Sequence, residues 1–251
     1  MCLVILSWKN DPDFPLLISA NRDEFFDRPT ASLHQWNTGI YAGRDLVAGG
    51  TWMGFHPNGK WAILTNYRDF KNPKKGEVSR GKLVSDFLNK NIPLEDYADQ
   101  VEGQKSMYDG FNLLISDGYD LFYISNYSSE IQIIQPGIHA ISNGLINDPW
   151  PKCELGKSQL FGVLNQEIEE ENLLNILKST ETFPLESLPK TGVSDEKEIL
   201  LSAQMIRMPP DYGTVSSTAV IREKSGLTRI KERKYAWDFT KYEDTFIRFQ
   251  L

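Results

Sequence analysis

The chain has 251 residues, of which 40% are hydrophobic and 24% charged, and these proportions exclude an intrinsically disordered protein. Acidic residues outnumber basic residues by 34 to 27, and the formal net charge of −7 argues against a general nucleic-acid backbone binder, which needs a positive surface. No apolar stretch approaches the ~18–20 residues of a membrane span, and the start of the chain lacks the basic leader of a secretory signal. We therefore expect no transmembrane segment, no nucleic-acid partner and a cytoplasmic location.

The cysteines and histidines do not have the spacing of a metal site. There are two cysteines, Cys2 and Cys153, and three histidines that lie far apart in the sequence. Two cysteines are too few for a disulfide scaffold or a zinc finger, and no histidine pair has the spacing of ligands on one helix face. We expect no metal site and no required cofactor.

Strand patterns dominate the first 66 residues. Residues 2–8 are apolar and β-branched, which is typical of a buried strand, and residues 15–21 form a second such segment after the turn cluster at 10–13. Two strands joined by a short polar turn predict a hairpin that returns residues 21–23 toward the start of the chain. Further strands are predicted at 39–42, 46–49, 52–56 and 60–66, where Gly49-Gly50 is either a bulge or a close approach of backbone to ligand.

Helical and strand segments follow one another in the rest of the chain. Apolar spacing predicts helices over 79–89, 94–104, 152–167, 170–179 and 195–203, and strands over 111–117, 120–126, 130–135, 138–142, 213–222 and 227–234. We expect the aromatic tail 237–251 to dock on the body, and the absence of repeats and linkers predicts a single domain spanning residues 1–251. The element order fits an α+β fold of two antiparallel sheets covered by helices better than a doubly wound parallel sheet, which needs strict alternation.

Cys2 is the first residue with chemical interest. Removal of Met1, which a small second residue generally permits, would leave Cys2 with a free α-amine. An α-amine has a reference pKa near ~7.7–8.0 and can accept the thiol proton at neutral pH. The thiolate is the reactive form, so nucleophile and base would reside in one residue. The alternative is a cysteine with only a structural role.

A polar tetrad follows the second predicted strand. Asn21, Arg22, Asp23 and Glu24 form either a charged strand exit or, through the hairpin, a group beside Cys2. In the second interpretation Asp23 orients the α-ammonium of Cys2, and Arg22 holds the thiolate or a substrate carboxylate by charge-assisted hydrogen bonds. Glu24 would then be a supporting acceptor or ion-pair partner.

Cys2 and the segment Ser-Ala-Asn-Arg-Asp-Glu-Phe-Phe-Asp-Arg-Pro at 19–29 resemble the signature of the NRDE family, also called the transport-and-Golgi-organisation protein 2 family. Later segments are similar to the family's other blocks in the expected order. They are Ala48–Gly54, Leu64–Arg68, Ser142–Gly144 with Pro149–Lys152, and Tyr212–Thr214 with Ser216–Val220. The resemblance thus runs over nearly the whole chain.

The resemblance implies a four-layer α/β/β/α sandwich, the fold of N-terminal-nucleophile hydrolases. Bile-salt hydrolases and penicillin V acylases of that superfamily use an N-terminal cysteine with an arginine and an aspartate, and Cys2, Arg22 and Asp23 match these roles. An asparagine and backbone N–H groups stabilise the oxyanion in those enzymes. Asn143 is the main candidate for this role, with Asn66 and Asn21 as further oxyanion or substrate candidates. Arg207 is the candidate for the superfamily's second, late arginine.

The sequence is compatible with two functions. One is hydrolysis of a non-peptide carbon–nitrogen amide bond by Cys2, with a small-molecule amide as substrate. The other is a non-catalytic haem or lipid binding or trafficking protein on the same fold, since a fold does not determine chemistry. Any haem would be held non-covalently, because no CxxCH attachment site is present. Aromatic residues at 25–26 and 52–61 would line an apolar pocket or, alternatively, pack in the core.

Overall fold

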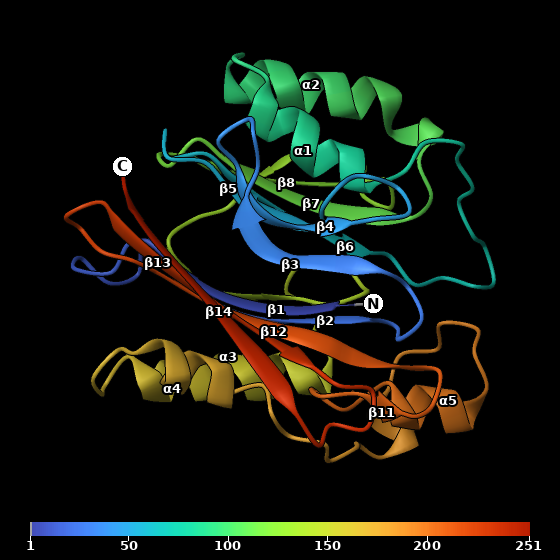
Figure 1. The fold of residues 1–251 in the computed structure, drawn as a ribbon. Coiled ribbons are helices and arrows are strands. Elements are labelled where there is room, and N and C mark those ends of the chain that lie inside the picture. Colours follow the sequence, from blue (N-terminus) through green and yellow to red (C-terminus); the bar gives the residue numbers. More distant parts are fainter. Residues whose placement is uncertain (1) are drawn as a thin grey trace. The chain divides into compact units, whose positions relative to one another are not determined.

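The computed structural model describes residues 2–251, which form two compact units (Figure 1). The first unit joins the residues up to Asp27 with Pro136–Gln250, and the second consists of Arg28–Gln135. Each unit contains one seven-stranded sheet in which the paired strands are antiparallel. The prediction of an α+β fold built on two antiparallel sheets is confirmed.

The sheet of the first unit has the strand order β10-β1-β2-β12-β13-β14, and β11 pairs with one end of β12. Its central strands are long, and β1 is buried throughout. The bounds are β1 Cys2–Trp8, β2 Leu16–Phe25, β10 Gly137–Ile141, β11 Arg207–Met208, β12 Tyr212–Arg222, β13 Leu227–Tyr235 and β14 Tyr242–Gln250. Strands β2 and β12 pair over ten positions although they are nearly two hundred residues apart in the chain.

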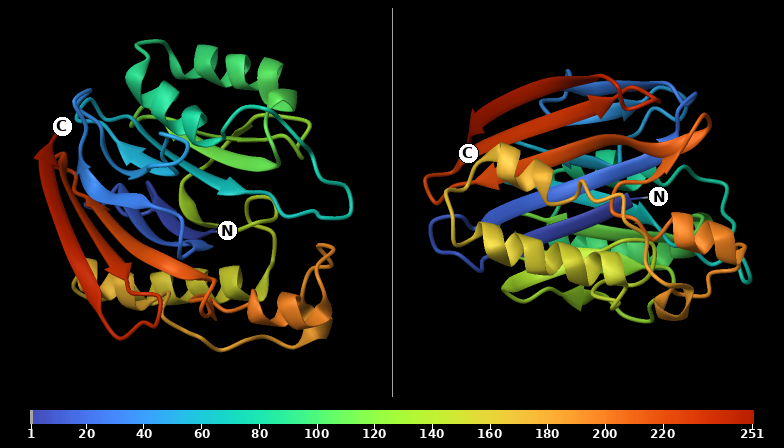
Figure 2. Two further views of the ribbon diagram at one scale, coloured as in Figure 1. Left: turned by 45° about the vertical axis from the view of Figure 1, so that its right-hand side comes forward. Right: turned by 90° about the horizontal axis from the view of Figure 1, so that it is seen from below.

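Helices cover one face of this sheet (Figures 1 and 2). They are α3 Pro151–Val163, α4 Glu170–Asn175 and α5 Asp195–Leu200, with the short 3-10 turn η2 Leu185–Ser187. Alternate apolar residues of the strands, such as Leu3, Ile5 and Ile221, pack against Leu160 and Leu173 of α3 and α4. Because side chains alternate between the two faces of a strand, this cluster identifies the helix-covered face residue by residue.

The sheet of the second unit has the sequential order β3-β4-β5-β6-β7-β8-β9. Its strands are β3 Thr30–Gln35, β4 Tyr41–Asp45, β5 Met53–Phe55, β6 Trp61–Asn66, β7 Phe111–Ser116, β8 Leu121–Ser125 and β9 Gln132–Ile133. Helices α1 Gly81–Asn89 and α2 Leu94–Gln104 and the 3-10 turn η1 Lys105–Met107 complete the unit. The apolar face predicted for α1 is buried, since Leu83, Val84, Phe87 and Leu88 belong to the core of this unit.

Several predicted boundaries were wrong in informative ways. The second predicted strand does not end at residue 21, because β2 continues through the polar tetrad to Phe25 and pairs with a neighbour on each side. Residues 46–49 are a turn rather than a strand, with Asp45 accepting hydrogen bonds from the backbone N–H groups of Val47 and Ala48. Strands β3 and β11 were not predicted. The aromatic tail docks as expected, in the form of β14.

None of the helices described over residues 2–251 has the length and apolar character needed to cross a membrane. Within the same residues, His, Cys, Asp and Glu side chains form no group of three or more that could hold a metal ion. The aromatic residues expected to line a pocket at 52–61 include Phe55 and Trp61, and both are buried in the core.

Candidate active site

The β1–β2 hairpin places Arg22 directly opposite Cys2 at the end of the two strands. The same register pairs Leu6 with Ile18 and Val4 with Ala20, which are apolar residues on the sheet face that carries Cys2 and Arg22. Cys2 is 7% exposed, and the Arg22 side chain is 13% exposed. The hairpin predicted from the sequence is confirmed, and it brings the cysteine and the arginine together.

Strand β10 flanks Cys2 on its other side. The antiparallel register pairs Val4 with Ile141, so its continuation by two residues puts Asn143 beside Cys2. A hydrogen bond of 2.9 Å, donated by the Ser142 hydroxyl to the carbonyl oxygen of Cys2, supports this continuation. Both Ser142 and Asn143 are buried. Cys2 thus lies between an arginine on one neighbouring strand and an asparagine that follows the other.

The tetrad residues are divided between the two faces of the sheet. Asn21 and Asp23 alternate with Arg22 and Glu24 along β2, so neighbouring members point to opposite sides. Asn21 contacts the helical segments, which assigns Asn21 and Asp23 to the helix-covered face. Arg22 and Glu24 share the other face with Cys2, and they form an ion pair with a nitrogen–oxygen distance of 3.3 Å.

Asp23 is a buried carboxyl group held by polar and charged neighbours. The Thr214 hydroxyl donates a 2.7 Å hydrogen bond to its Oδ1 atom, across the pairing of β2 with β12. Burial raises the pKa of Asp23, whereas the ammonium of Lys152, the Thr214 hydrogen bond and the guanidinium of Arg22 oppose that rise. Lys152 is itself buried and donates to the carbonyl oxygen of Leu201 at 2.9 Å.

The Cys2 thiol is held in its neutral form. Burial raises its pKa, and the nearby carboxylate of Asp23 acts in the same direction. The guanidinium of Arg22 and a hydrogen bond from the backbone N–H of Asp23 to the sulfur lower the pKa, because both favour the thiolate. A thiol in this environment needs a base to remove its proton before it can attack a carbonyl group.

Arg207 lies on the same sheet face as Arg22 and Glu24. Gly213 of β12 pairs with Glu24 on one side and with Arg207 of β11 on the other, so the three residues form one row across the strands. Gly213 has no side chain, and a Cβ atom there would lie 2.7 Å from the carbonyl oxygen of Ile206. The guanidinium of Arg207 stacks on the ring of Phe239 at 4.6 Å from its centroid.

Asn21 makes structural hydrogen bonds. Its amide nitrogen donates to the carbonyl oxygens of Leu177 and Gln204, each at 2.9 Å, and its oxygen accepts from the Ser217 hydroxyl at 2.6 Å. The residue is fully buried on the helix-covered face. Its geometry therefore favours support of the sheet over contact with a substrate, in contrast to the sequence-based expectation.

Asn66 belongs to the second unit, where it is the last residue of β6 and pairs with Phe111 of β7. The structure therefore brings together Cys2, Arg22, Asp23, Glu24 and Asn143 within the first unit, with Arg207 on the same face. Their roles in chemistry stay predictions.

Sequence reasoning missed Lys152, Thr214 and Ser142 as partners of these groups. Lys152 and Thr214 both lie in segments that resemble sequence blocks of the family. The position of Lys152 directly after Pro-Trp-Pro was the one sequence feature that could have marked it as a site residue. The contacts of Thr214 with Asp23 and of Ser142 with Cys2 depend on pairing between segments far apart in the chain, and Lys152 comes near Asp23 through the packing of α3, so local patterns do not reveal them.

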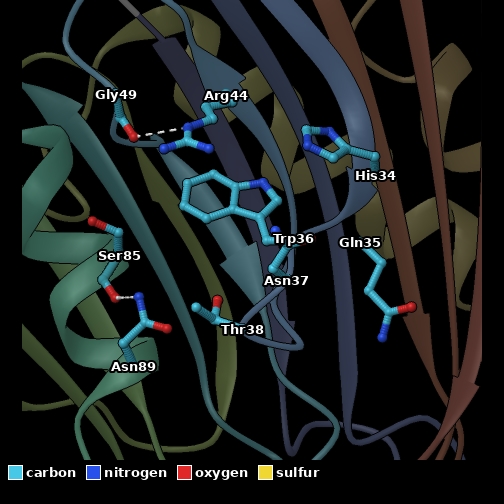
Figure 3. Close-up of a pocket in the computed structure, with 9 residues that line it drawn as sticks. All are labelled: His34, Gln35, Trp36, Asn37, Thr38, Arg44, Gly49, Ser85 and Asn89. Carbon is cyan, nitrogen blue, oxygen red and sulfur yellow. Dashed lines mark hydrogen bonds between the residues drawn. The ribbon is translucent and has the colours of Figure 1, made fainter.

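The second unit contains a pocket of about 360 Å³ between β3, β4 and α1 (Figure 3). Trp36 stands at its centre, with Arg44 over the indole at 4.7 Å from the ring centroid. Most of the lining residues are polar: His34, Gln35, Asn37, Thr38, Ser85 and Asn89. Arg44 also donates to the carbonyl oxygen of Gly49 at 3.1 Å.

Comparison with known proteins identifies the family of this chain. The family model described as Transport and Golgi organisation 2 matches residues 1–236. The chain belongs to this family. A Transport and Golgi organization protein 2 homolog from Bos taurus is 31% identical over 100% of this chain and 99% of its own length. The human homolog of the same name is 29% identical, covering 98% of this chain and 99% of the relative.

A solved structure supports the fold of this family member. A variant of the conjugated bile acid hydrolase from Clostridium perfringens aligns with a TM-score of 0.50 at 8% identity, over 100% of this chain and 97% of that chain. At this identity the likeness concerns the fold alone. The α+β fold that the family resemblance implied, that of the N-terminal-nucleophile hydrolases, is thereby confirmed.

Proposed function

We propose that this protein is an N-terminal-nucleophile amidohydrolase in which Cys2 attacks a non-peptide carbon–nitrogen amide bond. The observation that carries the proposal is the register of the β1–β2 hairpin, which pairs Arg22 with Cys2. The hydrolase-like fold makes this constellation relevant, because cysteine, arginine and aspartate are the residue types that such chemistry needs.

The reaction requires Cys2 to be the first residue of the mature chain, after removal of Met1. Its α-amine then accepts the thiol proton, and the resulting thiolate attacks the amide carbonyl carbon to form a tetrahedral oxyanion. When the intermediate collapses, the carbon–nitrogen bond breaks and the leaving amine takes the proton from the α-ammonium. Water, deprotonated by the same amine, then hydrolyses the thioester and restores the thiol.

The neighbours of Cys2 have distinct roles in this scheme. Arg22 favours the thiolate electrostatically, and its charge is shared with the Glu24 carboxylate at 3.3 Å. Asp23 donates its backbone N–H to the sulfur, while its side chain, held by Thr214, supports the strand end. Asn143 is the proposed donor to the oxyanion, because the β1–β10 register continues to it.

Arg207 is the proposed recognition residue for an acidic or polar substrate group. It lies on the Cys2 face of the sheet, in the row that contains Glu24 and Gly213. Adjacent strands are about 4.8 Å apart, so two strand spacings separate Arg207 from Glu24 by about 10 Å. An arginine at that distance can hold a carboxylate or sulfonate without contacting the scissile bond.

The test combines intact mass with a panel of N-acyl amides. We expect the purified untagged chain to lack Met1, to hydrolyse at least one amide, and to lose that activity in Cys2→Ala. Cys153→Ala is the matched control, because burial raises the pKa of Cys153 to about 12 and its replacement should leave the activity intact. Full activity of Cys2→Ala, or retention of Met1 in an active protein, would rule out the mechanism.

A non-catalytic haem or lipid carrier is the alternative that the same preparation can test. The pocket around Trp36 is lined mainly by polar side chains, which fits a porphyrin or an acyl chain poorly, since such ligands need an apolar lining. A Soret shift with haem, or uptake of a fluorescent fatty acid, in a protein that hydrolyses none of the amides would favour the carrier.

A further inference from the structure

Strand β14 forms an exposed edge of the first unit's sheet. It pairs with β13 over all nine residues, and no other strand of the described chain, residues 2–251, pairs with its outer side. Long edge strands are usually protected, because their free N–H and C=O groups are templates for another strand. Here two aromatic side chains remain in solvent, with Tyr242 58% and Phe246 52% exposed. The edge thus has the character of an interaction surface.

The hairpin between β13 and β14 determines which backbone groups point outward. The backbone N–H of Ala236 donates to the carbonyl oxygen of Lys241 at 2.9 Å, so this pair is hydrogen bonded across the two strands. Hydrogen-bonded and non-hydrogen-bonded pairs alternate in an antiparallel ladder. It follows that residues 242, 244, 246, 248 and 250 direct their N–H and C=O groups away from β13.

We propose that β14 is the dimer interface of this protein, and that it pairs antiparallel with β14 of a second copy about a two-fold axis at Phe246. Such an interface is isologous, so each residue faces a partner that faces it in return. Phe246 is the middle residue of Tyr242–Gln250, so this register overlaps the whole strand. The outward groups then make about ten backbone hydrogen bonds between the two copies.

Charge selects this register over the alternatives. Centring on Phe246 places Asp244 of each copy opposite Arg248 of the other, which gives two pairs of opposite charge. A two-fold axis at Asp244 or at Arg248 would instead place like charges opposite one another, which destabilises a sheet. The Phe246 register is therefore favoured by length, hydrogen bonding and charge together.

Arg248 is available for this pairing. Its guanidinium makes no ion pair within residues 2–251 that the structure describes, and its neighbour on β13 is Arg229, another cation. Asp244 already accepts from Arg233 at 2.7 and 2.8 Å and contacts Lys231 at 3.1 Å. A carboxylate has about four lone-pair sites, so it can accept one further bond.

The aromatic side chains add apolar contact across the axis. Phe246 of one copy meets Phe246 of the other, and aromatic cross-strand pairs stabilise a sheet. Strand β14 also lies beyond residues 1–236, the part of the chain that the family model matches.

The experiment is sedimentation velocity of the full-length protein over a concentration series, with charge-reversal variants. We expect the wild type to sediment as a dimer, and Arg248→Glu to raise the dimer dissociation constant about tenfold or more, because two attractive pairs become repulsive. Lys82→Glu is the matched control, since it makes the same charge change on the exposed side of α1 and should leave the dimer intact. A monomeric wild type, or equal dissociation constants for Arg248→Glu and the control, would overturn the proposal.

A cross-link tests the register independently. Phe246→Cys places two thiols across the axis, so a short bis-maleimide should join two chains into one band on a denaturing gel. Phe161→Cys, which replaces a phenylalanine that is 62% exposed on α3, is the control and should stay monomeric on the gel. A dimer that cross-links no better through position 246 than through position 161 would contradict the β14 pairing.

Discussion

The structure assigns Asn21 a structural role, whereas the sequence made it a candidate for contact with the oxyanion or the substrate. Replacing Asn21 with alanine distinguishes these two roles. The side chain is fully buried and makes three hydrogen bonds: two to the carbonyl oxygens of Leu177 and Gln204, and one from the Ser217 hydroxyl. These bonds join β2 to the segment after α4 and to the segment before β11. Asn21→Ala would leave two buried carbonyl groups without the donor that Asn21 supplies, and the Ser217 hydroxyl without its acceptor.

The expected loss of stability in Asn21→Ala follows from those three hydrogen bonds. A buried hydrogen bond contributes about 0.5–1.5 kcal/mol, and a partner left unsatisfied costs about 1–3 kcal/mol, so we expect a total of about 3–5 kcal/mol. This is a large share of the ~5–15 kcal/mol that stabilises a typical domain, but it leaves folded protein to study. Asn165→Ala is the matched control, because its single side-chain bond to Phe161 is exposed and its loss should cost less than about 1 kcal/mol.

The assay is urea unfolding, followed by circular dichroism and tryptophan fluorescence, with the free energy taken by linear extrapolation. The rate of Cys2 alkylation is measured on the same samples in the absence of urea. We expect Asn21→Ala to lose stability but to keep the alkylation rate. If the variant unfolds like the wild type while its Cys2 reactivity collapses, the structural assignment of Asn21 is wrong.

Three further predictions concern the site and the β13–β14 region. Asn143→Ala should lower kcat on a confirmed amide about 10²–10³-fold with little change in KM, and an unchanged kcat would remove Asn143 from the oxyanion role. Arg22→Gln should slow Cys2 alkylation at neutral pH several-fold, because Arg22 lowers the pKa of the thiol, and the pH–rate profile should move to higher pH; a profile that stays in place would contradict the electrostatic role. The hydrogen bond from Arg233 lowers the pKa of Glu171 to about 2, so this stabilisation is complete above the unfolded pKa of about 4.5 and lost as pH falls toward 2. Arg233→Gln should therefore lower the free energy of unfolding by about 1–2 kcal/mol near pH 7, after allowance for solvent screening of Glu171, and by almost nothing near pH 2. Denaturant titrations at the two pH values measure this, and an equal loss of stability at both would refute the reasoning.

Local patterns predicted most of the elements because strand and helix periodicities are properties of short segments. Residues 2–8 are apolar except for Ser7, and they form β1 with the predicted bounds. Helix α2 likewise spans the predicted residues 94–104. The short strand β11 escaped prediction because its two residues carry no period of their own and owe their conformation to pairing with β12.

The sequence by itself determined that a hairpin would return residues 21–23 toward Cys2, because a hairpin is a local structure. It left open whether the tetrad at 21–24 is a charged strand exit or a group beside the thiol. It could not determine which tetrad members face the thiol. That depended on β12, which pairs with β2 from the far end of the chain, and on the helices that cover one face of the sheet. These contacts carry β2 through the tetrad and turn Asn21 and Asp23 toward the helices, while Arg22 remains beside Cys2. Only tertiary pairing decides which tetrad residues face the thiol. Each residue of a strand points to one face of the sheet or the other, and the local sequence does not determine which face the helices cover.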